Sequence, residues 1–145
     1  MSMFNIFDIA GSGMTAQSLR LNVTASNLAN ADSAASSTDK TYRARQPVFS
    51  TMMVDAMGGG GSGSGDGETG VGVQVKGIVE SQAPLRRQYQ PNNPMANKEG
   101  YVYLPNVNMV EEMANMISAS RSYQTNVDVA NTAKQMMMRT LQMGQ

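Results

Sequence analysis

A glycine-rich hexapeptide is the part of this sequence that comes closest to a cofactor-binding motif. Residues 65–70, GDGETG, match the G-x-G-x-x-G spacing with which backbone N–H groups at a helix N-terminus hold a pyrophosphate. Here a strand pattern follows the glycines, and the carboxylates of Asp66 and Glu68 would repel the phosphates. Two carboxylates are also too few oxygen ligands for a calcium ion. We interpret the glycine-rich residues 58–72 as a flexible surface hairpin or linker.

The other charged residues form no catalytic set. Glu111 and Glu112 are adjacent, so on a helix they point about 100° apart, and their expected role is to stabilise the first turn. Arg86 and Arg87 are interpreted as solvated or interface charges. The chain has no His and no Cys, which removes the commonest general base, metal ligand and thiol nucleophile. A Ser–Lys pair remains open, but no spacing supports one. We expect no enzyme, catalytic residue, cofactor or metal.

Charge and hydropathy exclude further classes of function. The chain carries 11 basic and 11 acidic residues and no dense basic block, which argues against nucleic-acid partners and basic membrane-surface binding. No apolar run approaches the roughly 18 residues of a membrane-spanning helix, so we expect no membrane insertion. Residues 1–14 lack a basic segment, and Asp8 interrupts their apolar stretch. We therefore expect any export to use a route without a cleaved signal peptide.

Residues 106–143 carry the strongest helical periodicity. Their apolar residues alternate at spacings of four and three, as in coiled coils. A helix over residues 109–141 would be about 50 Å long, longer than a compact domain of this size. Asn108 is positioned to cap its first turn. On this helix the predicted packing seam consists of Met109, Met113, Met116, Tyr123, Val127, Ala130, Met137 and Leu141, and the polar Ser120 and Lys134 complete the spacing. On the N-terminal helix the seam consists of Phe7, Met14 and Leu21.

Residues 4–31 are also predicted to be helical, with two apolar faces. One column of residues spaced by seven is Phe7, Met14, Leu21 and Leu28, and the other is Ile9, Ala16 and Val23. Two positions along a helix correspond to about 200°, so the columns lie nearly opposite each other. One partner helix cannot cover both, which indicates packing among helices of several molecules. Gly11 and Gly13 leave two alternatives: a helix that passes through them at a close contact, or one that begins after Gly13 with Ser12 as its cap.

Residues 40–104 hold most of the prolines and glycines. Alternating residues predict strands within 42–49, 71–79 and 101–104, with an irregular connection before the last. The predicted fold class is mainly α: paired long N- and C-terminal helices, similar to a coiled coil, with a small β-rich insertion between them. The predicted divisions are an N-terminal helix in residues 1–35, the insertion with its glycine-rich loop 58–72 in residues 36–105, and a C-terminal helix in residues 106–145.

The end of the N-terminal helix resembles a signature of flagellar proteins. Residues 25–30 read A-S-N-L-A-N, the form that this signature commonly takes in the flagellar axial family of rod and hook proteins. Residues 9–17, 42–49, 100–108 and 119–126 resemble further segments of the proximal-rod members of that family. The glycine-rich run departs from the family pattern, which leaves the shape of the middle loop open. The signature residues, implied to lie at an interface, are Ala25, Ser26, Asn27, Leu28, Ala29 and Asn30.

This resemblance implies a structural subunit of the flagellar proximal rod, which polymerises into the drive shaft between the motor ring and the distal rod and hook. The implied partners are copies of the chain, other rod proteins, membrane-ring and rod-adaptor proteins, and the flagellar type III export apparatus. The implied location is the periplasmic rod of the basal body. The alternative is a small coiled-coil adaptor or export chaperone that dimerises through residues 109–141. Asn27 and Asn30 share a helix face, and they contact a neighbouring subunit, cap the helix with Asn30 left-handed, or do both.

Overall fold

The computed structural model describes residues 3–53 and 71–144. Its elements in chain order are α1 (Met3–Ala29), β1 (Arg45–Met53), β2 (Val71–Glu80), β3 (Arg86–Tyr89), β4 (Tyr101–Leu104) and α2 (Met109–Met143). The loop predicted at residues 58–72 lies outside the described residues except for Val71 and Gly72, which begin β2.

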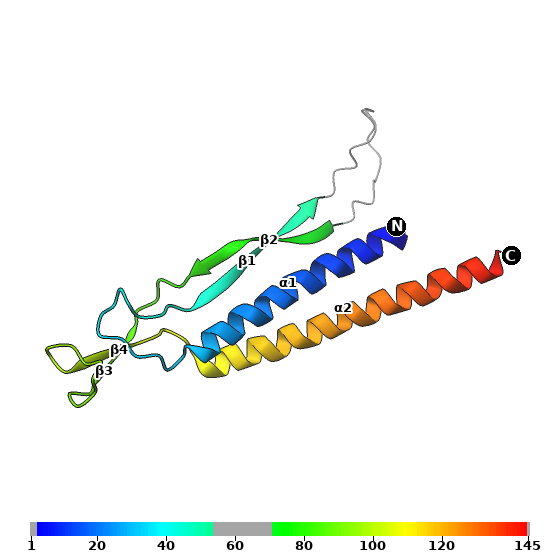
Figure 1. Cartoon of the computed structure of the whole chain (residues 1–145). Coiled ribbons are helices and arrows are strands. Elements are labelled where there is room, and N and C mark those ends of the chain that lie inside the picture. The colour runs from blue at the N-terminus through cyan, green and yellow to red at the C-terminus, as the bar shows by residue number, and fades with distance from the viewer. Residues whose placement is uncertain (1–2, 54–70, 145) are drawn as a thin grey trace, which may run out of the picture.

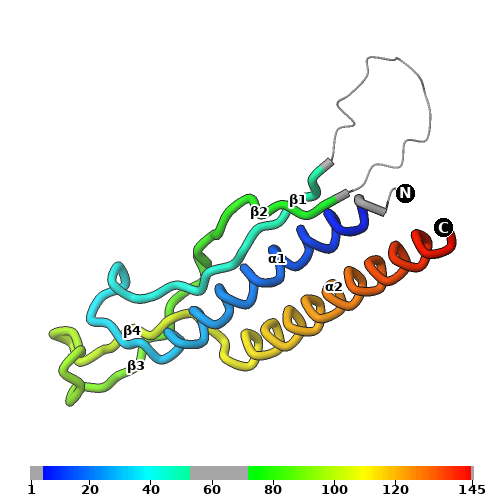
Figure 2. Tube along the Cα trace, turned by 45° about the vertical axis from the view of Figure 1, so that its right-hand side comes forward, coloured from blue at the N-terminus to red at the C-terminus, as the bar shows by residue number. Residues whose placement is uncertain are grey.

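The described elements form an elongated body with three layers. Helices α1 and α2 lie side by side and run in opposite directions, so that the N- and C-terminal ends lie at the same end of the body (Figure 1). The hairpin of β1 and β2 lies along α1 on the side away from α2, whereas β3 and β4 lie at the other end of the body (Figure 2). Helix α1 is therefore the middle layer, in contact with α2 and with both strands of the hairpin.

The hairpin covers one side of α1. Its strands are antiparallel, with Arg45 opposite Glu80 and a bulge between Val48 and Phe49. The backbone N–H of Val73 donates to Ser12 Oγ over 3.1 Å, and this hydroxyl donates to a carbonyl of α1 rather than capping the helix start. Because one partner helix of the same chain cannot cover both apolar faces of this helix, we expected helices from other molecules to cover the second face. On this side the neighbour is instead a hairpin of the same chain.

Small residues bring α1 and α2 together. Helix α1 includes Gly11 and Gly13, so the alternative that it begins after Gly13 is wrong. A Cβ atom on Gly13 would lie 2.7 Å from Asn126 Nδ2 of α2, whereas one on Gly11 would meet nothing within 4 Å. Ala119 and Ala133 are the apolar residues of α2 that are fully buried. The helices therefore pack by close backbone approach more than by interlocking large side chains.

The two glycines of α1 give a matched test of this close approach. We expect Gly11→Ala to raise the free energy of unfolding by about 0.5–1 kcal/mol, because it removes the backbone entropy cost of a helical glycine without a clash. Gly13→Ala should raise the free energy of unfolding by less, because Asn126 must move to make room for the new methyl group. Urea unfolding followed by circular dichroism measures both. An equal gain at the two positions would contradict the close contact.

The predicted fold class, mainly α, is wrong. Among the residues that the structure describes, about 50% are helical and 21% lie in strands, which form two small antiparallel sheets. Strands β1 and β2 have 9 and 10 residues and form a layer along α1 rather than a minor appendage (Figure 1). The chain is thus an α+β protein in which the N- and C-terminal helices flank a β insertion.

Strand β3 was not predicted, for a physical reason. It reads RRQY, and all four of its residues are exposed, so it has no alternation of buried and exposed side chains. It forms a strand because it pairs with β4: Arg86 lies opposite Leu104, and Tyr89 lies opposite Tyr101. Gly100 precedes β4 with a φ of +81°, a conformation that side chains with a Cβ rarely adopt.

Candidate functional site

The Asn27 side chain is the centre of a junction between all three layers. Only 1% of Asn27 is exposed. Its Nδ2 donates to Arg45 O over 2.8 Å and to Glu112 Oε1 over 3.0 Å. Its Oδ1 accepts from Arg45 N and from the Tyr42 hydroxyl, each over 2.9 Å. One amide thereby connects the end of α1, the start of β1 and the start of α2, and both its donors and its acceptor are used. We call these four residues the Asn27 junction.

Glu112 is the acidic member of the Asn27 junction. It is 7% exposed, although it lies in the first turn of α2. Burial raises the pKa of this carboxyl above its usual value, the hydrogen bond from Asn27 opposes the rise, and the charge of Glu111 adds to it. Glu112 was expected only to stabilise the first turn. Its sequence position gave no sign of a partner 85 residues away.

The raised pKa has a definite consequence for stability. A carboxyl with a higher pKa in the folded state stabilises the fold while it is protonated and loses this contribution as the pH rises through the folded pKa. We expect Glu112→Gln to keep the acceptor for Asn27 and remove this loss. The stability difference between the variant and the wild type should therefore grow in favour of the variant as the pH rises above 4.5, the usual pKa of this carboxyl. Urea unfolding at a series of pH values measures this stability difference. A difference that does not change with pH would contradict the raised pKa of Glu112.

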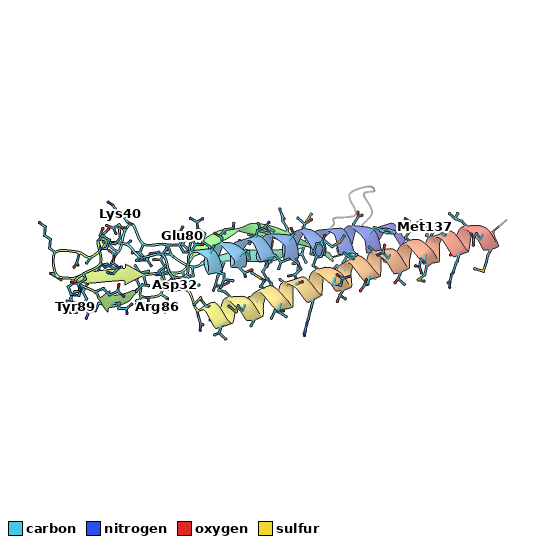
Figure 3. All side chains as sticks on the ribbon, turned by 60° about the horizontal axis from the view of Figure 1, so that its bottom comes forward. Asp32, Lys40, Glu80, Arg86, Tyr89 and Met137 are labelled. Atoms are coloured by element: carbon cyan, nitrogen blue, oxygen red, sulfur yellow. The ribbon has the colours of Figure 1, made fainter. Side chains whose placement is uncertain are left out.

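Further polar contacts fix the strands around the Asn27 junction. Asn106 Oδ1 accepts from Ala44 N over 2.8 Å, and its Nδ2 donates to Ala83 O over 3.0 Å. The guanidinium of Arg86 donates to Pro105 O and Ala31 O. Figure 3 places Arg86 at the end of the body opposite Met137, which lies far along α2. The polar connections are therefore concentrated at one end of the molecule.

The signature residues differ in burial. Asn27 is buried, Ser26, Leu28 and Asn30 are half-buried, and Ala25 and Ala29 are exposed. Asn30 Nδ2 donates to Ser26 O within the last turn. No residue other than glycine has a positive φ in the described part of the chain, so Asn30 caps the helix without the left-handed conformation that we considered.

The predicted seam divides into a covered and an uncovered part. On α1, Phe7, Met14 and Leu21 are half-buried. On α2, Met116, Val127, Ala130 and Met137 are half-buried, whereas Met109, Met113, Tyr123 and Leu141 are exposed.

A second column on α2 was not predicted from the sequence. It is spaced by seven and consists of Glu112, Ala119, Asn126 and Ala133, of which Asn126 contacts Gly13 and the other three are buried. The neighbouring column, which contains Met113, is the more hydrophobic of the two, because alanine, asparagine and glutamate are less hydrophobic than methionine, valine and leucine. A search for apolar periodicity therefore selects the column of Met113. The recurrence of alanine at this spacing, together with glycine on α1, is the signal that could have identified the column.

Large apolar side chains remain on the outside of α2. Val110 is 76% exposed and Ile117 is 56% exposed, and Met113 lies between them at a spacing typical of one helix face. Farther along, Val129, Met136 and Met143 are exposed at intervals of seven. We call the first three residues the outer α2 face. A soluble monomer seldom leaves such continuous apolar surface uncovered.

The chain has close relatives among characterised bacterial proteins. It is 53% identical to the flagellar basal-body rod protein FlgC of Salmonella typhimurium over the full length of both chains. The chain belongs to the FlgC family. FlgC proteins of Escherichia coli O6:H1 and Buchnera aphidicola are also similar, at 54% identity over all of both chains and 47% over 97% of each. Residues 7–34 match the family "Flagella basal body rod protein", and residues 98–143 match "Flagellar basal body rod FlgEFG protein C-terminal".

Membership of the FlgC family makes the chain a structural rod subunit of the flagellar basal body. The family regions include α1 from residue 7 onward, with its signature, and all of α2, so they contain both Asn27 and Glu112. None of the helices in the described part of the chain is both long and apolar enough to cross a membrane.

Proposed function

We propose that the chain polymerises with itself and with other rod proteins into the proximal part of the drive shaft, which transmits torque from the motor ring to the distal rod and hook. The observation that supports this function is the outer α2 face. Val110, Met113 and Ile117 are exposed on a helix that contacts α1 on its other side. Burial of apolar surface contributes about 25 cal/mol per Å², so covering this face would drive association.

The described geometry also suits a mechanical role. The Asn27 junction joins the two helices and the hairpin at one end, and the close approach of Gly13 to Asn126 joins the helices farther along. Close-packed interiors transmit strain because they have low compressibility. We propose that residues 1–35 and 106–145 act together as the helical domain of the shaft, and that residues 36–105 form an insertion that contacts neighbouring subunits.

The partners and location follow as parts of the same proposal. Membrane-ring and rod-adaptor proteins would contact the chain at the base of the rod in the periplasm, and the flagellar type III apparatus would export it. The signature at residues 25–30 would contribute to subunit contacts through its exposed and half-buried members.

Electron microscopy of purified basal bodies tests this function. We expect the chain, carrying an added tag, to lie in the rod next to the membrane ring, and we expect cells without it to lack the rod beyond that point. A complete rod in its absence would contradict the proposal. A closed dimer whose mass does not change with concentration in sedimentation would instead favour the adaptor or chaperone alternative.

A further inference from the structure

One oxygen of the buried Glu112 carboxyl has no partner. Oε1 accepts the hydrogen bond from Asn27, whereas Oε2 is buried without a hydrogen bond. A buried polar atom left unpaired costs about 1–3 kcal/mol, and more when it carries charge. Since more than nine-tenths of Glu112 is buried, an unpaired oxygen here requires an explanation.

Glu112 lines a small cavity where the three layers meet. The cavity has a volume of about 170 Å³ and is bounded by Arg20 and Thr24 of α1, Arg45 and Pro47 of β1, and Asn115 of α2. A water molecule occupies about 30 Å³, so the cavity is several times larger than a single bridging water needs. It is also smaller than the roughly 300 Å³ of an ordinary small-molecule pocket. Its size suits the end of one inserted side chain.

The two cations of this cavity are engaged elsewhere. The guanidinium of Arg20 lies 5.1 Å from the centroid of the Phe49 ring. The guanidinium of Arg45 pairs with Glu80 over 3.2 Å and lies over the Tyr42 ring. Neither donates to Glu112. Within the described part of the chain, therefore, no cation is hydrogen-bonded to Oε2 of this carboxyl.

We infer that a lysine or arginine side chain of an adjacent rod subunit enters this cavity and donates a hydrogen bond to Glu112 Oε2. This inference rests on the proposed assembly into a rod, because it needs a neighbouring subunit. Hydrogen bonds between a cation and a carboxylate are about twice as strong as neutral ones, and burial strengthens them further. Asn27 would then do two things: hold the three layers together and orient the carboxylate toward the neighbour.

The burial of Glu112 gives this contact a role in assembly. In the free subunit burial destabilises the charged carboxylate, which is the cause of its raised pKa. A neighbouring cation would stabilise the charged form, so assembly would relieve an unfavourable feature of the free subunit. The contact would thereby favour the assembled state over the isolated one.

A competition experiment tests the inference. Differently tagged wild-type and Glu112→Gln chains are produced in the same cells, and their ratio in purified basal bodies is compared with their ratio in the whole cell. The matched control is Glu111→Gln, which removes the same charge from the exposed neighbouring position. Melting of each purified chain confirms that the variants fold.

We expect the share of Glu112→Gln in basal bodies to fall about tenfold or more, because its amide presents N–H groups to an incoming donor. Glu111→Gln should be incorporated like the wild type. Equal incorporation of both variants would overturn the inference and leave water as the partner of Oε2. If even the wild-type chain were absent from basal bodies, the proposed function itself would fail.

Discussion

Replacing Asn27 by alanine is expected to lower the free energy of unfolding by about 3–5 kcal/mol. The substitution removes both the donors and the acceptor of one buried amide. It leaves the backbone of Arg45 and Glu112 Oε1 without this partner, whereas the Tyr42 hydroxyl keeps its contact with Ser26 Oγ. Each buried unpaired group costs about 1–3 kcal/mol. Urea unfolding of the purified chain measures the loss.

Asn30→Ala is the matched control for this prediction. Both asparagines belong to the signature and lie on the same helix, but the Asn30 side chain makes a hydrogen bond only within its own turn. We expect a loss of about 1 kcal/mol or less. A loss at Asn27 no greater than that at Asn30 would mean that the Asn27 junction does not hold the layers together.

Negative charge on the outer α2 face is expected to abolish assembly while leaving the fold intact. The double variant Met113→Glu, Ile117→Glu places two carboxylates on side chains that are already exposed, so the free chain should melt within a few degrees of the wild type. In the rod the same carboxylates would be buried without partners, at a cost of several kcal/mol. We expect no motility and no variant chain in basal bodies.

The control for this variant adds the same charge elsewhere on α2. Ser118→Glu and Gln124→Glu replace exposed polar residues, which need no apolar neighbour. We expect cells with these substitutions to retain motility. Loss of motility in both variants would indicate that the number of charges matters and the outer α2 face does not.

The helices were predictable from the sequence because their periodicity extends over many turns. The predicted ranges 4–31 and 106–143 differ from α1 and α2 by only a few residues at each end. The cap at Asn108 is confirmed, since its side chain accepts from Val110 N. Such local features depend on residues that are close in sequence.

The features that depend on distant residues were not predictable in the same way. Asn27 could be assigned to a signature from the sequence. Its hydrogen bond to Glu112 could not be predicted, because the two residues are 85 positions apart. Strand β3 has no alternation of its own and is ordered by β4. The hairpin layer was underestimated because a strand pattern carries no information on which helix it will cover.

The most direct test of the central claim, that neighbouring subunits cover the outer α2 face, is the reactivity of a single cysteine. The native chain has no Cys, so Met113→Cys provides one thiol on this face. We predict that a maleimide labels it readily in the isolated chain and far more slowly in intact basal bodies, with full labelling restored after the basal bodies are dissociated. Equal labelling rates in the isolated chain and in intact basal bodies would contradict the claim.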